Sequence, residues 1–171
     1  MGLLKKCMDF YLKKTSLIKY AKIIGVSIGE NCKLNGSPDW GSEPWLISLG
    51  NHSEVSFDCA FVTHDGATWV FRKEERYKDI IKFGRIKIGD DCFIGARSTI
   101  LPGVTIGNRS IVASGAVVAK SIPSGEVWGG VPAHFIMTVD EYAEKCLANT
   151  PKYDPIRLQT HKKDETLKIT K

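Results

Sequence analysis

Residues 86–123 read IKIGDDCFIGARSTILPGVTIGNRSIVASGAVVAKSIP and repeat a six-residue pattern without a slip. An aliphatic side chain opens each repeat, at Ile88, Ile94, Ile100, Ile106, Val112 and Val118. Four residues after each stands a small or modest side chain: Cys92, Ser98, Val104, Ser110, Ala116 and Ile122. A period of six is neither the 3.6 of a helix nor the alternation of an extended strand. It predicts short strands that each end in a bend, with one aliphatic side chain per bend pointing inward.

The same step recurs earlier, at Leu49, Val55 and Phe61 and, in a shorter block, at Ile28 and Leu34. One repeat cannot bury its own apolar face, so the repeats must stack. The predicted fold is all-β dominated, a parallel β-helix, because a β-sandwich would produce six in-phase positions only by coincidence. Glycine follows several of the aliphatic residues: Gly29, Gly50, Gly89, Gly95 and Gly107. We expect these glycines to adopt bend angles that other residues avoid.

Two interruptions break the six-residue phase. Leu34 and Leu49 are 15 residues apart, and the segment between them contains Pro38, Gly41 and Pro44, which predicts a small turn-rich excursion. Phe61 and Ile88 are 27 residues apart, which predicts an inserted loop over about 65–85. Its central stretch, RKEERYKD at 72–79, fits either a lid over an acceptor site or a solvated hairpin.

The two ends differ from the repeats. Residues 1–22 are predicted to contain an amphipathic, basic helix whose apolar side is formed by Leu3, Leu4, Cys7, Met8, Tyr11 and Leu12. This helix fits either a cap over the open end of a β-helix domain at 23–137 or contact with an anionic membrane surface. Thr138 and Glu141 form a capping box, which predicts a helix over 138–150. The polar tail at 151–171 is expected to be frayed and without chemistry.

Composition narrows the class of protein. The 171 residues are 43% hydrophobic and 25% charged, as in a globular domain, and no apolar run approaches the ~20 residues of a membrane span. The five cysteines are scattered, which argues against a disulfide framework or zinc site and favours a reducing cytoplasm. The net charge of +5 suits phosphate-bearing small molecules, and the basic residues form no run typical of nucleic-acid binders.

Over residues 24–137 the sequence resembles the left-handed parallel β-helix, hexapeptide-repeat acyltransferases. Within them it is similar to the sugar O-acetyltransferases, which include galactoside, maltose, capsular and lipopolysaccharide acetyltransferases. Besides the hexads, WGGVPAHFI at 128–136 resembles the turn that closes the last coil, and FVTHDGATWVF at 61–71 stands where the family carries its catalytic histidine. The resemblance implies left-handed coils, acetyl-CoA as the acyl donor without a metal, and a homotrimer with active sites between subunits.

His64 is the candidate catalytic base, since imidazole accepts and returns protons near neutral pH. Its ring needs an orienting group, and the sequence leaves Glu43, Glu54 and Asp58 open for that role. Among substrate-binding candidates, Asp65 either contacts the acceptor or shapes the turn. Trp69 either stacks on a sugar ring or packs the base of the loop.

The resemblance also implies positions along the pantetheine and nucleotide of CoA. Ala96 and Ser114 match positions whose backbone binds pantetheine, and Ala119 and Lys120 match a threonine–lysine pair near the nucleotide. Lys120 would meet a phosphate as a point charge, whereas Ala119 lacks the hydroxyl of the threonine. Met137 stands where galactoside-type enzymes carry a basic residue, so Arg97, Arg109 or His134 is a substitute candidate for the phosphate.

The function expected from these residues is acetyl transfer from acetyl-CoA to a sugar hydroxyl, in surface polysaccharide synthesis. Two alternatives stay open: N-acetylation of an amino-sugar nucleotide, and a non-catalytic β-helix scaffold. A γ-type carbonic anhydrase needs three closely arranged zinc-binding histidines, and His52, His64 and His134 lack that arrangement.

Overall fold

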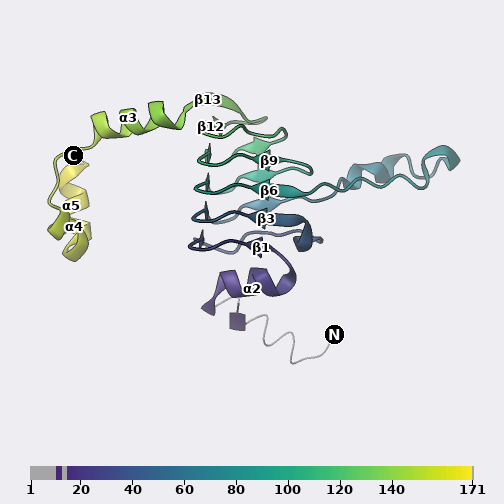
Figure 1. Ribbon diagram of the computed structural model, residues 1–171, viewed down its shortest axis with the longest axis horizontal. Coiled ribbons are helices and arrows are strands. Elements are labelled where there is room, and N and C mark those ends of the chain that lie inside the picture. The colour runs from purple at the N-terminus through teal and green to yellow at the C-terminus, as the bar shows by residue number, and fades with distance from the viewer. Residues whose placement is uncertain (1–10, 13–14, 171) are drawn as a thin grey trace. The chain divides into compact units, whose positions relative to one another are not determined.

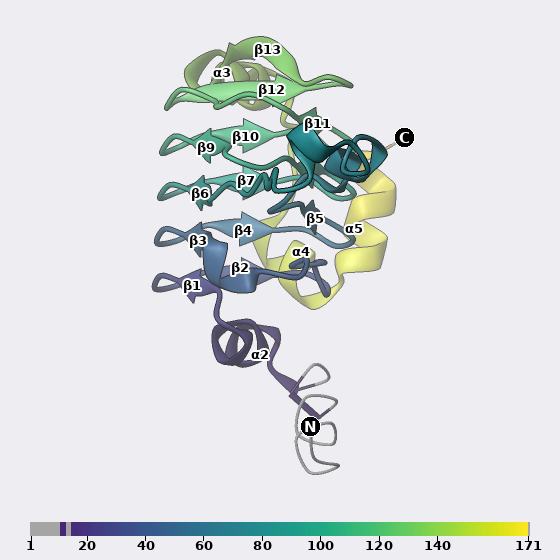
Figure 2. The same cartoon turned by 90° about the vertical axis from the view of Figure 1, so that its right-hand side faces the viewer.

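The computed structural model describes residues 11–12 and 15–170. The chain forms two units, residues 1–139 and residues 140–171. The first unit is a stack of coils with short strands on three faces (Figures 1 and 2). The second is helical.

Three sheets form the faces of the stack. Sheet A contains β1 (Ser27–Ile28), β3 (Ile47–Leu49), β6 (Ile86–Ile88) and β9 (Thr105–Ile106). Sheet B contains β2 (Lys33–Leu34), β4 (Glu54–Val55), β7 (Phe93–Ile94), β10 (Ile111–Val112), β12 (Glu126–Gly129) and β13 (His134–Thr138). Sheet C contains β5 (Ala60–Phe61), β8 (Thr99–Ile100) and β11 (Val117–Val118). All pairs are parallel except β12 with β13, which turns back on the last coil, so the parallel β-helix is confirmed.

The interior is filled as the repeat predicts. The aliphatic residues at the sixfold positions are at most 3% exposed: Ile88, Ile94, Ile100, Ile106, Val112 and Val118. The side chains four residues later are also buried: Cys92, Ser98, Val104, Ser110, Ala116 and Ile122. Each two-residue strand points its second side chain inward, which explains why one aliphatic residue per strand is enough.

The role expected for the glycines beside the bends is wrong. The five glycines that follow aliphatic residues do not have a positive φ. They lie where the next coil passes closest: a Cβ on Gly89 would approach the Asn108 backbone nitrogen to 2.8 Å, and one on Gly95 would approach Ser114 N to 2.5 Å. The left-handed bend conformation belongs instead to non-glycine residues: Asn31, His52, Asp58, Asp91, Arg97 and Arg109.

Side-chain oxygens join the coils at the bend between sheets A and B. Asn51 Oδ1 accepts from Glu30 N at 2.9 Å, Asp90 Oδ1 accepts from Asn51 N at 2.6 Å, and Asn108 Oδ1 accepts from Asp90 N at 3.0 Å. These bonds satisfy backbone donors where the strand ladder is interrupted.

Helix α2 (Leu17–Ile24) covers the first coil. Ser16 caps it by accepting from Lys19 N, and Gly25 ends it in the left-handed conformation. Ala21 is fully buried, and Ile18 and Ile24 pack against the core. Most of the helix expected over 1–22 lies outside the described residues, so the contact with a membrane surface stays a prediction.

The two interruptions of the repeat are irregular. The first holds a 3₁₀ turn, η1 (Pro44–Leu46), and pairs back to the stack through Asp39 and Ala60. The second is an arm between β5 and β6, with η2 (Gly66–Val70) and η3 (Glu75–Tyr77), which projects away from the coils (teal, Figure 1). The outgoing and returning segments of the arm are hydrogen-bonded to each other at its neck, where Gly84 N donates to Thr63 O at 2.8 Å and Asp65 N donates to Lys82 O at 2.9 Å.

The helical unit continues from α3 (Val139–Asn149) into α4 (Pro155–Thr160) and α5 (Lys162–Ile169). The expectation of a frayed polar tail is wrong, because local polar contacts hold these helices. Asp154 caps α4, and the buried Glu165 carboxylate accepts from Asp154 N at 3.1 Å and lies 3.4 Å from the Arg157 guanidinium. Among the helices of residues 11–12 and 15–170, none is long and apolar enough to cross a membrane.

Candidate active site

His64 lies where the chain leaves the stack for the arm. Phe61 ends β5 inside the core and stacks on Trp40 at 4.8 Å between ring centroids. Thr63 is buried, and the backbone of His64 pairs with Phe83 on the returning strand of the neck. The Phe83 ring lies 5.9 Å from the imidazole. The histidine is therefore fixed on a rigid edge although it belongs to an irregular segment.

Glu43 is the group that orients His64. Its Oε2 accepts from Thr63 Oγ1 at 2.6 Å and lies 2.9 Å from His64 Nδ1. The hydrogen bond from Thr63, followed by that from His64, lowers the pKa of Glu43 below its ordinary value of 4.5, so the carboxylate is ionised at neutral pH. The Glu43 side chain is 17% exposed and that of His64 is 43% exposed, so the pair is sheltered on one side and open on the other.

The other two orienting candidates lie elsewhere. Glu54 points outward from sheet B and accepts from the Asn35 amide. Asp58 sits at the bend between sheets B and C, 3.7 Å from the Arg97 guanidinium. The repeat phase alone predicts the position of Glu54, because Glu54 directly precedes the inward Val55 and must face away from the core.

The hydrogen bond to Glu43 selects the tautomer of His64. A carboxylate accepts only, so Nδ1 carries the proton and Nε2 keeps its lone pair. Among the described residues, no hydrogen bond reaches Nε2. This nitrogen can therefore act as a base toward a group in the adjoining cavities.

Asp65 shapes the start of the arm. Its Oδ1 accepts from Ala67 N at 2.9 Å and caps η2, and its Oδ2 lies 2.8 Å from Lys82 Nζ. The ion pair with Lys82, followed by the bond from Ala67, lowers the pKa of Asp65. Both oxygens are thus engaged at the neck, which matches the turn-shaping role left open by the sequence.

Two cavities adjoin His64, and both are also lined by Asp65, Gly66 and Lys82. The arm-side cavity, of about 260 Å³, is lined by Glu43, His64, Asp65, Gly66, Thr68, Trp69, Arg72, Lys82 and Phe83. The coil-side cavity, of about 390 Å³, is lined by Val62, His64, Asp65, Gly66, Lys82, Leu101, Pro102 and Ala119. The His64 side chain can therefore contact a molecule bound in either cavity.

Trp69 contributes to the arm-side cavity as an exposed ring. Trp69 is 74% exposed, which argues against its ring packing at the base of the arm. Farther along the arm the Phe71 and Tyr77 rings meet edge to face at 5.7 Å. Trp69 is therefore available to a ligand or to another copy of the chain.

The four residues matched to CoA positions fall into two groups. Ala119 and Lys120 follow β11, at the edge of sheet C that is formed by the carboxyl ends of its strands and that also carries His64. Ala119 lines the coil-side cavity. Ala96 and Ser114 precede β8 and β11, at the opposite edge of the same sheet. Within one chain, sheet C separates the two groups.

The substitute phosphate candidates are also spread out. Arg97 follows Ala96 on the bend between sheets B and C, where its guanidinium lies 5.9 Å from the Phe57 ring. Arg109 belongs to the bend between sheets A and B, away from either edge of sheet C. His134 opens β13, and its Nδ1 lies 3.4 Å from Pro132 O.

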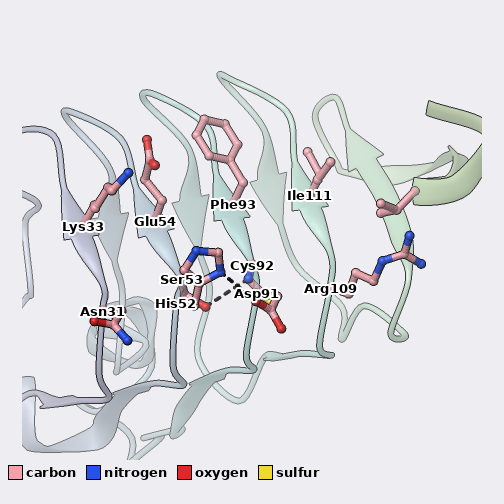
Figure 3. A pocket seen from close by; sticks show the side chains of 11 residues that line it. Asn31, Lys33, His52, Ser53, Glu54, Asp91, Cys92, Phe93, Arg109 and Ile111 are labelled. Atoms are coloured by element: carbon pink, nitrogen blue, oxygen red, sulfur yellow. Dashed lines mark hydrogen bonds and ion pairs between the residues drawn. The ribbon is translucent and has the colours of Figure 1, made fainter. Parts of the chain in front are cut away.

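A separate groove of about 290 Å³ lies on the outer face of sheet B and along the bend between sheets A and B (Figure 3). His52 and Asp91 meet there, with Nδ1 2.7 Å from Oδ1, while Lys33, Glu54, Phe93 and Ile111 project from successive strands. The His52 and Asp91 side chains are 72% and 60% exposed. This pair is more open to solvent than His64 and Glu43, so water weakens the orienting effect of the carboxylate.

Within residues 11–12 and 15–170, no group of three or more His, Cys, Asp or Glu side chains is arranged to hold a metal ion. Burial raises the pKa of the Cys59 and Cys92 thiols, which keeps them protonated inside the coils. His64 with Glu43 is therefore the arrangement best suited to proton transfer.

Comparison with known proteins identifies the family of the chain. Residues 85–120 match the family described as "Bacterial transferase hexapeptide (six repeats)". The chain is 44% identical to Protein CapG of Staphylococcus aureus over 128 residues, 74% of this chain and 73% of the relative.

Two solved structures share the fold. One is the hexapeptide-repeat acetyltransferase VCA0836 from Vibrio cholerae, with a TM-score of 0.58, 19% identity and coverage of 78% and 88%. The other is a galactoside acetyltransferase in complex with coenzyme A, with a TM-score of 0.53, 21% identity and coverage of 82% of both chains. The chain belongs to the hexapeptide-repeat acyltransferase family.

Proposed function

We propose that the chain transfers an acetyl group from acetyl-CoA to a hydroxyl group of a sugar, with His64 as the general base. The observation that carries the proposal is the hydrogen bond between His64 Nδ1 and Glu43 at 2.9 Å, at a histidine that lines two cavities. Family membership supplies the reaction class. The expected place of this reaction is surface polysaccharide synthesis in the cytoplasm, with contact at the inner face of the membrane left to the N-terminal segment.

The geometry supports a simple proton path. His64 Nε2 takes the proton of the acceptor hydroxyl while the oxygen bonds to the acetyl carbon. His64 then returns this proton to the CoA sulfur as the carbon–sulfur bond breaks, so the base is regenerated. Glu43 holds the ring and stabilises the imidazolium that forms between the two transfers. Thr63 keeps the Glu43 carboxylate in place.

The residues at the edges of sheet C fit an acyl donor. When bound, acetyl-CoA supplies an activated thioester. The coil-side cavity is lined by the apolar Leu101 and Pro102 beside His64, which suits the end of the pantetheine arm. Lys120 is exposed beyond this cavity and would meet a phosphate.

The separation of the two edges supports a homotrimer. Ala96 and Ser114 reach the donor site most simply if they come from a neighbouring copy whose edge lies against that of His64. Exposed apolar residues of the arm outside the arm-side cavity support the same arrangement: Val70, Ile80 and Ile81. The left-handed sense of the coils and the trimer are expectations that come from the family.

The first test is thermal unfolding with and without acetyl-CoA. Saturation at ~100 times the dissociation constant should stabilise the native state by about 2.7 kcal/mol. With a donor site established, His64→Ala should lower acetyl transfer by roughly 10²–10⁴-fold. No stabilisation by acetyl-CoA, free CoA or longer acyl-CoAs would favour the scaffold alternative. Paired hydroxyl and amino acceptors separate O-transfer from N-transfer.

A further inference from the structure

The arm-side cavity contains two basic side chains that differ in their contacts. Lys82 Nζ lies 2.8 Å from Asp65 Oδ2, so its charge is balanced within the site. Arg72 lines the same cavity, and no hydrogen bond or ion pair reaches its guanidinium from the described part of the chain. The acidic groups facing it are Glu43 and Asp65, and each is already engaged by neighbours. One positive group in the cavity is therefore left for a ligand.

The walls beside Arg72 suit a sugar ring. Trp69 and Phe83, 74% and 55% exposed, line the same cavity and offer aromatic faces to the carbon-bound hydrogens of a pyranose. The volume of about 260 Å³ is near the lower end, roughly 300 Å³, for small-ligand pockets. This size favours the reacting sugar residue itself, with the rest of the acceptor outside.

We propose that the acceptor is an anionic saccharide whose carboxylate or phosphate binds Arg72 while its hydroxyl faces His64 Nε2. A guanidinium matches both anions because its planar fork donates two parallel hydrogen bonds. The inference rests on the proposed function and narrows its acceptor to acidic sugars. Arg72 acts as a specificity-determining residue, and Lys82 keeps its role at the neck.

Arg76 provides a matched control on the same arm. Its guanidinium lies over the Tyr77 ring, 5.4 Å from the centroid, and it does not line the cavity. Arg76→Gln therefore removes the same charge from the arm without changing the cavity. Arg72→Gln removes the charge from the cavity, and Arg72→Lys restores the charge without the planar fork.

The experiment compares one neutral acceptor with two anionic ones. The neutral member is p-nitrophenyl β-glucoside, the carboxylate member is p-nitrophenyl β-glucuronide, and glucose 1-phosphate represents the phosphates of activated sugars. Transfer is followed by release of CoA, and binding without donor is followed by saturation-transfer NMR, both at low salt. We expect an anionic member to have a KM and a dissociation constant about fivefold or more below those of the glucoside. Glucuronide preference indicates an acidic sugar residue, and preference for glucose 1-phosphate indicates a sugar phosphate.

The preference should disappear in Arg72→Gln, return in part in Arg72→Lys and persist in Arg76→Gln. Equal binding of all members by the wild-type protein, undetectable binding of every member, or a preference that survives Arg72→Gln would overturn the inference. Acetylation of the neutral glucoside that depends on His64 would keep the proposed function while rejecting an anionic acceptor. Failure to bind acetyl-CoA rejects the function separately, because saccharide binding is measured without donor.

Discussion

Glu43 contacts two side chains that would otherwise move independently. Its Oε2 accepts from Thr63 inside the fold and from His64 at the cavity, so the buried hydroxyl fixes the carboxylate and the carboxylate fixes the ring. A base whose ring can rotate presents the wrong nitrogen for part of the time. The value of Glu43 to the reaction is therefore positional as well as electrostatic.

Glu43→Gln should lower kcat by roughly 10–10³-fold and leave the KM for acetyl-CoA nearly unchanged, because the amide neither selects the tautomer nor stabilises the imidazolium. Steady-state kinetics checks this. Glu54→Gln is the matched control, since Glu54 faces outward and bonds to Asn35. Equal kcat values for the Glu43 variant and the control would remove Glu43 from the mechanism.

The same carboxylate makes stability depend on pH. The pKa of Glu43 is lowered in the folded state, chiefly by Thr63, so the unfolded chain takes up this proton at higher pH than the folded chain. Its contribution to stability is complete above the unfolded pKa and is lost as the pH falls through the folded pKa. Urea unfolding should show that the difference in unfolding free energy between wild type and Glu43→Gln narrows as the pH falls below the ordinary glutamate pKa of 4.5. A difference that stays constant over this range would contradict the assignment.

The sequence identifies His64 but not its partner, and the reason is geometric. His64 and Glu43 are 21 residues apart, and each lies in a segment that leaves the six-residue phase. Where the phase holds, it says which way a side chain points, which places Glu54 outside. Where it fails, the path of the chain depends on contacts such as the stacking of Trp40 on Phe61, and no spacing in the sequence encodes these.

At the scale of the element, the repeat depends on how closely successive bends pass. Gly50, Gly89 and Gly107 follow inward aliphatic residues, and an added Cβ on each would lie within 3 Å of the backbone of another coil. The added Cβ meets main-chain atoms as well as the side-chain oxygens of Asp90, Asn108 and Ser124, so moving a side chain alone does not relieve the clash. The coils would have to separate to relieve it, which weakens the parallel ladder on the neighbouring strands.

Gly89→Ala should therefore destabilise the fold by about 1–3 kcal/mol, the usual cost of overpacking. Its Cβ would lie 2.8 Å from Asn108 N and 3.0 Å from Asn108 Cα. Gly66→Ala is the matched control, since a Cβ there meets nothing within 4 Å, and its effect should stay within about 0.5 kcal/mol. Chemical denaturation measures both. Similar unfolding free energies for the two variants would show that the coils separate without cost.

The elements also differ in how far sequence could predict them. The strands on all three faces follow from the period, because burial of one aliphatic residue per strand constrains every repeat in the same way. The two C-terminal helices α4 and α5 were missed because their stability comes from single contacts. Asp154 caps one helix and Glu165 accepts the Asp154 N–H from the other, and such a pair leaves no periodic signal.

At the scale of the whole molecule, the two edges of sheet C define what a complete donor site requires. His64, Ala119 and Lys120 lie at one edge, and Ala96 and Ser114 lie at the other. If both groups contact one acetyl-CoA, the second group comes from a neighbouring copy. A cyclic assembly then contains as many donor sites as subunits, each made by a different pair.

Mixing two inactive variants tests this arrangement. His64→Ala removes the base, and Ser114→Trp places a bulky ring at an exposed position of the opposite edge. In trimers refolded from equal amounts, a site that draws His64 and Ser114 from different copies is intact in about a quarter of cases, and activity should return to that fraction of wild type. If one chain supplied both groups, every site would carry one defect and no activity would return. Light scattering on the same mixtures gives the subunit number, so loss of assembly is distinguished from a site formed within one chain.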